Sequence, residues 1–227
     1  MLVAEAVAAG WTCEEQFVPE GSDSAVTGAG NVFELADGVL ERVASTETPQ
    51  APLAIVAMPD DRTPDLLSTA SFVVVLDRVS DPGNLGTILR SAEAAGADLV
   101  ALTPGSVDPF NPKAVRSSAG ALFHVPIATA QIEDVAAAGL ELFGTTSRGF
   151  PGRTVVSYTE ADLTGRIAVV MGNEAAGLPD EWDDTVGPVR SWLTIPHEGR
   201  SESLNVAMAT TVLVFESARQ RRRARPG

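Results

Sequence analysis

From residue 71 onward, short apolar runs alternate with amphipathic segments along the chain. The apolar runs are too short for core helices and lack polar alternation, so each one predicts a strand that is buried on both faces. The expected strands are 71–77, 98–103, 124–129, 140–146, 166–172 and 191–196, and the expected helices are 84–96, 113–123, 132–139 and 202–222. This pattern predicts an α/β domain with a mostly parallel sheet and helices on both faces.

The first 57 residues show a weaker alternation, which predicts a smaller α/β unit. Its expected elements are a helix at 2–9, an apolar segment at 15–18, a helix at 31–45 and a strand at 53–58. The chain opens within a helix and no strand precedes it, so we expect this unit to be incomplete at its front. The segment 58–70 is rich in Pro and Asp and predicts a linker. The large domain is therefore expected to span 71–227.

Composition favours a cytoplasmic protein. The chain has 227 residues, of which 44% are hydrophobic, and no apolar stretch approaches the roughly 18 residues of a membrane span. The N-terminus lacks the basic residues and the cleavage site of a signal peptide. Cys13 is the single cysteine, which excludes an internal disulfide.

The net charge of −14 argues against nonspecific binding to nucleic acid, because phosphate affinity comes mainly from Lys and Arg. The arginines are clustered, however, notably in 218–227, and a local positive surface is enough for an enzyme that acts on RNA. The same cluster fits the solvated end of a helix equally well, since positive charge there complements the helix dipole. Charge alone leaves both interpretations open.

Ligands of parallel α/β sheets bind outside the carboxyl ends of the strands, so the loops after 71–77, 166–172 and 191–196 are the candidates for a site. The first of these loops lacks the G-x-G-x-x-G fingerprint of dinucleotide binding. Its Pro-Gly pair predicts a turn, and Asn84 is expected to cap the following helix. Arg90 lies six residues further on and, taken alone, predicts a solvated side chain.

The other two loops carry polar residues at strand ends. In the second, Gly172 allows a close approach of backbone to a ligand, and Gly177 allows a tight turn. Glu174 between them either accepts hydrogen bonds from a ligand, orients an arginine, or stabilises a helix N-terminus. In the third, Ser203 and Asn205 stand at the start of an apolar helix. A cap explains one of these two polar residues but not both.

The three loops, in this order, resemble the three signature motifs of the SpoU/TrmH branch of the SPOUT RNA methyltransferases. The resemblance covers about 71–222 and is carried by "LDRVSDPGNLGTILRSAEAAGAD", "VVMGNEAAGLP" and "LTIPHEGRSESLNVAMATTVLVFE". It implies a C-terminal trefoil knot, a homodimer, and transfer of a methyl group from S-adenosylmethionine (SAM) to a ribose 2′-hydroxyl of RNA. The front unit resembles the small RNA-recognition domain that many members carry.

The resemblance also assigns roles to individual residues. The catalytic group that it implies consists of Arg90, Asn84, Glu174, Ser203 and Asn205. The SAM contacts that it implies are Gly172, Ile195, Leu204, Thr145, Gly177 and Pro196. We hypothesise that Arg90, held by an RNA phosphate and by Asn84 or Glu174, positions the hydroxyl and assists loss of its proton. Neither His124 nor His197 has a nearby ligand partner in the sequence, so no metal is expected.

Ribosomal RNA of the large subunit is the expected substrate, because of the front unit, and transfer RNA is the alternative. A second alternative is an inactive RNA-binding or ribosome-assembly factor of the same fold, which the acidic balance favours and the intact motifs oppose. A hydrolase that uses Ser203 is disfavoured, because the chain has no G-x-S-x-G elbow. No membrane partner is expected.

Overall fold

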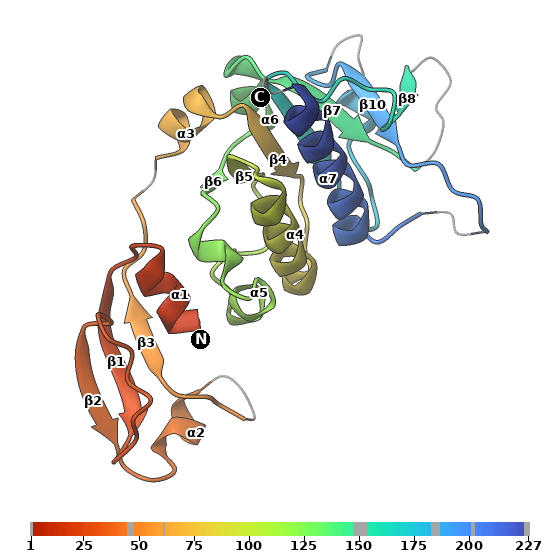
Figure 1. Cartoon of the computed structure of the whole chain (residues 1–227). Coiled ribbons are helices and arrows are strands. Elements are labelled where there is room, and N and C mark those ends of the chain that lie inside the picture. The colour runs from red at the N-terminus through yellow and green to blue at the C-terminus, as the bar shows by residue number, and fades with distance from the viewer. Residues whose placement is uncertain are drawn as a thin grey trace. The chain divides into compact units, whose positions relative to one another are not determined.

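The computed structural model describes residues 2–44, 48–60, 62–147, 154–182, 187–200 and 203–224. The chain divides into two compact units, Met1–Asp61 and Arg62–Gly227 (Figure 1). Each unit has its own sheet, and the two are described separately below. The assignment of the first unit to RNA recognition stays a prediction.

The second unit is built on a seven-stranded sheet with the order β6-β5-β4-β9-β7-β10-β8. The strands are β4 (Phe72–Leu76), β5 (Leu99–Leu102), β6 (Ile127–Thr129), β7 (Glu141–Thr145), β8 (Val155–Ser157), β9 (Ile167–Met171) and β10 (Ser191–Thr194). All the described pairings in this sheet are parallel. The expectation of a mostly parallel sheet is therefore confirmed, and β8 is a strand that the apolar pattern missed.

Helices cover both faces of this sheet, as predicted. Every residue of the central strands β4 and β9 is buried. Val73 and Val75 of β4 belong to a core cluster with residues of α3 (Thr63–Thr69) and α6 (Ile132–Ala137). The opposite layer contains α4 (Pro82–Ala95), α5 (Pro112–Ser117) and α7 (Val206–Ala224), and α4 lies side by side with α7 (Figure 1).

The start of α4 differs from the prediction that Asn84 caps it. The cap is Asp81, whose carboxylate accepts a hydrogen bond from the Asn84 backbone N–H at 2.8 Å. Pro82 occupies the first turn, where its missing N–H costs nothing. The helix therefore begins before Asn84 and leaves that side chain available for other contacts. Gly96 ends the helix with a φ of 76°.

The start of α7 corrects the expectation of a helix from residue 202. Asn205 is the cap, because its Oδ1 accepts hydrogen bonds from the N–H groups of Ala207 at 2.9 Å and Met208 at 3.4 Å. Ser203 precedes the helix, and Ser201 and Glu202 lie outside the described residues. Of the two polar residues at the helix entry, Asn205 is therefore the one that the cap explains. Its side-chain nitrogen has a further partner, which is described with the site.

The arginine cluster at the end of α7 is partly structural. The Arg221 guanidinium donates to the backbone carbonyls of Leu163 at 3.2 Å, Ser71 at 2.9 Å and Gly165, and its carbon lies 5.0 Å from the centre of the Phe72 ring. Arg219 pairs with the carboxylate of Glu216 at 2.7 Å through its Nε. Arg221 therefore fastens α7 to neighbouring segments, whereas Arg219 pairs within the helix, and neither interpretation of the cluster foresaw these contacts.

Two further segments differ from the prediction. The expected linker 58–70 contains α3, whose Leu67 is 4% exposed in the core of the second unit. The expected helix 113–123 is α5 followed by a separate 3₁₀ turn, Ala121–Phe123. The break lies at Ala119 and Gly120, whose φ angles of 51° and 98° cannot continue a helix.

The first unit has a three-stranded mixed sheet with the order β2-β1-β3. Its elements are α1 (Leu2–Ala8), β1 (Cys13–Pro19), β2 (Asn31–Leu35), α2 (Val39–Val43) and β3 (Leu53–Val56). The predicted helix over 31–45 is wrong in its first part, where β2 pairs with β1 and the Phe33 ring stacks on Phe17 at 5.6 Å. In neither unit do the described helices include one that is long and apolar enough to cross a membrane.

Candidate active site

A cleft of about 600 Å³ lies at the carboxyl ends of β7, β9 and β10 and is closed by the entry to α7. Its volume is in the range of small-molecule sites, and its position is the one expected for a parallel α/β sheet. The lining residues are Thr145–Ser147, Met171–Leu178, Trp192, Leu193, Ile195, His197, Ser203–Val206, Ala209 and Leu213.

The loop after β9 forms one wall of this cleft as a tight turn. A Cβ at Gly172 would collide with the backbone of Gly177 and Leu178, so only glycine permits the turn to close. Asn173 fixes its inner side, because its Oδ1 accepts hydrogen bonds from the N–H groups of Ala175 and Ala176, each at 3.0 Å. The glycine at 172 thus makes room for the protein's own backbone, where the sequence suggested room for a ligand.

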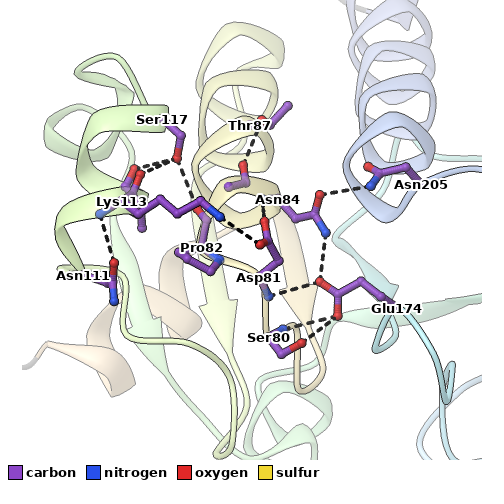
Figure 2. A network of polar contacts seen from close by, with 12 residues as sticks. Ser80, Asp81, Pro82, Asn84, Thr87, Asn111, Lys113, Ser117, Glu174 and Asn205 are labelled. Carbon is purple, nitrogen blue, oxygen red and sulfur yellow. Dashed lines mark hydrogen bonds and ion pairs between the residues drawn. The ribbon is translucent and has the colours of Figure 1, made fainter. Parts of the chain in front are cut away.

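Glu174 joins this loop to the start of α4 (Figure 2). Its carboxylate accepts hydrogen bonds from the backbone N–H groups of Ser80 and Asp81, each at 3.3 Å, and from the Ser80 hydroxyl at 3.2 Å. The Asn84 side-chain amide donates to the same carboxylate at 2.9 Å. Glu174 therefore stabilises a helix N-terminus, that of α4, which is one of the three roles that the sequence left open.

The hydrogen bonds set the ionisation of Glu174. Burial by itself would raise the pKa of the carboxyl, but the Asn84 amide and the backbone N–H groups of Glu174, Ser80 and Asp81 outweigh burial and hold the pKa below its ordinary value. Glu174 is accordingly a carboxylate at neutral pH. A carboxylate with so many donors is suited to hold the loops in place and poorly suited to accept a proton from a substrate.

Asn84 connects the two other loops. Its Nδ2 donates to Glu174, and its Oδ1 accepts a hydrogen bond at 3.0 Å from Nδ2 of Asn205 (Figure 2). Asn205 uses its own Oδ1 to cap α7, so one side chain performs both functions. The chain of contacts Glu174–Asn84–Asn205 thus brings together the loop after β9, the start of α4 and the entry to α7.

The cleft offers what a nucleoside-bearing cofactor such as SAM needs. Ile195, Leu204 and Leu178 provide apolar walls for a ring. Gly177 has a φ of 71°, and no atom lies within 4 Å of the place where its Cβ would stand, so its backbone faces open space. Apolar walls with a few polar groups and accessible backbone are typical of such sites. The residues present therefore fit the cofactor that the motifs imply.

The structure brings most of the predicted site residues to the cleft. The predicted residues that line it are Thr145, Gly172, Glu174, Gly177, Ile195, Ser203, Leu204 and Asn205. Asn84 lies behind the lining and reaches it through Glu174 and Asn205. Pro196 is not part of the lining, although Ile195 and His197 on either side are. The chemical roles of these residues stay predictions.

Arg90 is the exception among the predicted catalytic residues. It is exposed on α4 and does not line the cleft of its own chain. The next residue, Ser91, has its hydroxyl 2.7 Å from that of Thr211 on α7, so Arg90 belongs to the surface of the α4–α7 layer. Within one chain, the arginine and the cleft are therefore separate.

Sequence reasoning missed two residues of the site. Asn173 was passed over between Gly172 and Glu174, although an Asn-containing turn after a strand is a usable signal for side-chain capping. Ser80 had no such signal, because its contact with Glu174 spans 94 positions. No group of three or more potential metal ligands occurs in the part of the chain that the structure describes.

Comparison with known proteins gives the same region a family. Residues 71–215 match the model of the SpoU rRNA Methylase family. The chain is 36% identical over 188 residues to the 23S rRNA (guanosine(2553)-2′-O)-methyltransferase RlmP of Bacillus subtilis, covering 81% of this chain and 71% of that protein. It is 34% identical over 200 residues to the 23S rRNA (uridine(2479)-2′-O)-methyltransferase of Streptomyces viridochromogenes, covering 82% of this chain and 66% of that protein.

Comparison with solved structures supports the same family. The SpoU methyltransferase AviRb of Streptomyces viridochromogenes in complex with AdoMet superposes with a TM-score of 0.82 at 30% identity, covering 99% of this chain and 89% of that one. An AdoMet-bound rRNA methyltransferase from Sinorhizobium meliloti gives a TM-score of 0.80 at 33% identity, covering 99% of this chain and 85% of that one. With its motifs, its parallel sheet and these relatives, the chain belongs to the SpoU rRNA methylase family.

Proposed function

We propose that this chain transfers a methyl group from SAM to a ribose 2′-hydroxyl of large-subunit ribosomal RNA. The observation that carries the proposal is the contact chain Glu174–Asn84–Asn205, which gathers the three family motifs at the rim of one cleft of suitable size. The relatives RlmP and AviRb, a 23S rRNA methyltransferase and an AdoMet-bound structure, support the substrate and the cofactor. The reaction is proposed to take place in the cytoplasm.

The chain's own residues have distinct tasks in this reaction. SAM, when bound, supplies an electrophilic methyl on a sulfonium. Leu204 and Ile195, with the backbone around Gly177, hold it in the cleft. Glu174 and Asn84 are positioning residues, because they fix the loops to one another through hydrogen bonds. Ser203 and Asn205 stand at the mouth, where the ribose has to enter. Rate enhancement by alignment of oxygen, methyl and sulfur is worth up to about 7–11 kcal/mol in well-oriented systems.

Arg90 requires a second copy of the chain in this proposal. We place it opposite the cleft of a partner protomer in a homodimer formed through the α4–α7 layer. Met208 and Phe215 support this arrangement, because they are 63% and 43% exposed and lie seven residues apart on one side of α7. Burial of these two large apolar side chains against a partner would remove them from water.

A trefoil knot at the C-terminus is also proposed. The last strand, β10, lies between β7 and β8, and α7 then returns to pack on α4 and β9. The outward step from β9 to β10, followed by the return of α7 to β9, supports a threaded chain. A crystal structure in which the C-terminal segment follows an unknotted path would refute the proposed knot.

The activity is tested by incubating the protein with methyl-labelled SAM and in vitro transcribed 23S rRNA, with transfer RNA in a parallel reaction. Label at a single ribose of the 23S rRNA is expected. Label on a base, on transfer RNA alone, or on no RNA would each contradict the proposal.

The dimer is tested by co-expressing two variants, Arg90→Ala and Asn205→Ala, each of which is expected to be inactive alone, so that mixed dimers form. If Arg90 acts across the interface, mixed dimers contain one intact site and regain partial activity. A mixture as inactive as its two components, from a dimer shown by light scattering, would place the arginine and the cleft in the same protomer.

A further inference from the structure

The backbone of Arg78, two residues after β4, has a φ of 51°. This left-handed conformation is strained for a residue that carries a side chain, and glycine would avoid the strain. Two hydrogen bonds hold it there. The Arg78 N–H donates to the Thr103 hydroxyl at 3.1 Å, and the Asn173 amide donates to the Arg78 carbonyl at 2.8 Å. Such strain beside a residue that lines the cleft, Asn173, motivates the hypothesis that the side chain itself has a use.

The Arg78 side chain is anchored at one end only. Its Nε donates to Oδ2 of Asp77 at 2.9 Å, and the Asp77 side chain is 4% exposed. The other carboxylate oxygen of Asp77 accepts from Thr103 at 2.9 Å. The Arg78 side chain is 46% exposed, and its two terminal nitrogens have no hydrogen bond to any part of the chain that the structure describes. The guanidinium thus keeps its forked edge, the edge that pairs with phosphate, available.

A simpler interpretation is that Arg78 only neutralises the buried Asp77. That task needs one N–H group and some positive charge, and it explains the Nε contact. It does not explain why a strained position next to the cleft carries a long side chain whose fork remains open. Asn173, which holds the Arg78 carbonyl, lines the cleft, and Ser80, two residues after Arg78, donates to Glu174. Arg78 is therefore one hydrogen bond away from a residue that lines the cleft.

The distribution of charge along the chain supports a role for Arg78 in binding phosphate. The unit Met1–Asp61 contains eleven Asp and Glu residues and a single basic residue, Arg42. Attraction for phosphate comes from Lys and Arg, so the RNA backbone has to be held mainly by the second unit. Within that unit, Arg166, Arg219 and Arg221 are occupied by backbone carbonyls or by Glu216. Arg78 is anchored and still has free donors.

From these contacts we propose that Arg78 binds a backbone phosphate of the RNA next to the ribose to be methylated. It acts as a positioning residue, with Asp77 and Thr103 fixing its direction. The inference rests on the proposed function, and it assigns a specific contact to a residue of the first motif that is not part of the contact chain Glu174–Asn84–Asn205.

The test compares Arg78→Gln with Arg42→Gln, a matched control in which an exposed arginine also donates its Nε to one local acceptor, the Gly38 carbonyl. Binding of in vitro transcribed 23S rRNA is measured by fluorescence anisotropy over a range of salt concentrations. Arg78→Gln is expected to weaken binding roughly tenfold and to reduce the salt slope by about 0.7. Methyl transfer should show a raised KM for RNA, with kcat and SAM affinity close to those of the wild type.

A second variant separates phosphate binding from the stability of Asp77. In Asp77→Asn/Arg78→Gln, no buried carboxylate is left unpaired, so the fold is spared while the phosphate contact is lost. Weak RNA binding by this double variant supports the proposal. Normal RNA binding by either Arg78 variant, or an equal loss in Arg42→Gln, overturns it. If the wild type binds RNA through Arg78 but transfers no methyl group, the proposed function fails, while the contact of Arg78 with an RNA phosphate is still supported.

Discussion

Asn84 and Glu174 are ninety positions apart in the sequence, yet their side chains meet at 2.9 Å. The contact fastens the first turn of α4 to the loop after β9, and the same amide accepts a hydrogen bond from Asn205 at 3.0 Å. One asparagine thus determines how three loops lie around the cleft. An amide is needed for this, because the position has to donate in one direction and accept in the other.

Replacing Asn84 with Asp should therefore abolish the arrangement while preserving the size of the side chain. The new carboxylate cannot donate to Glu174 and repels it. We expect kcat for RNA methylation to fall about a hundredfold, as for other small misplacements in a site. Thr87→Ala on the same helix is the control and should keep wild-type activity. An active Asn84→Asp enzyme would show that the contact has no role in positioning.

Gly172 should tolerate no side chain. In Gly172→Ala the new Cβ would meet the backbone of Gly177 and Leu178, and a backbone cannot move aside as a flexible side chain can. We expect a loss of about 1–3 kcal/mol in the free energy of unfolding, together with weaker SAM binding by calorimetry. Gly199→Ala is the matched control, because no atom lies within 4 Å of its Cβ position. Equal behaviour of the two variants would contradict the tight-turn interpretation.

Arg221 should matter for stability and not for RNA. Its guanidinium bonds backbone carbonyls on two segments and covers Phe72, so Arg221→Met leaves those carbonyls without a charged donor. Urea unfolding should show a loss of about 1–3 kcal/mol. Arg222→Met, at an exposed position on the same helix, should be close to neutral. A weaker affinity for RNA in Arg221→Met without a change in stability would reverse this assignment.

Glu174 should give the protein part of its sensitivity to acid. Its folded-state pKa lies below the ordinary value of about 4.3, so its contribution to stability is complete above that pH. The contribution is lost as pH falls through the folded pKa, when the carboxyl gains a proton. The effect is small, because the residue is exposed and solvent screens it.

Thermal unfolding from pH 7 to pH 3 provides the measurement. The wild type should lose more stability over this range than Glu174→Gln, which has no carboxyl to protonate at this position. Identical slopes for the two proteins would show that the hydrogen bonds to Glu174 do not stabilise the fold.

The sequence by itself determined the parallel α/β architecture and the three loops that carry the site. The local pattern was sufficient to predict the strands, because strands such as Phe72–Leu76 are continuous apolar runs. It was sufficient to predict the site loops, because the carboxyl ends of parallel strands meet at one edge of the sheet. Only the tertiary structure decided what each polar residue does. Whether Asn84 caps its helix or bridges two loops depends on Asp81 starting the helix earlier and on Glu174 arriving from ninety positions away. The cap at Asp81 is a local interaction, three residues before Asn84, which the prediction of a cap at Asn84 overlooked. The contact of Asn84 with Glu174 depends on the packing of distant elements, which no local pattern encodes.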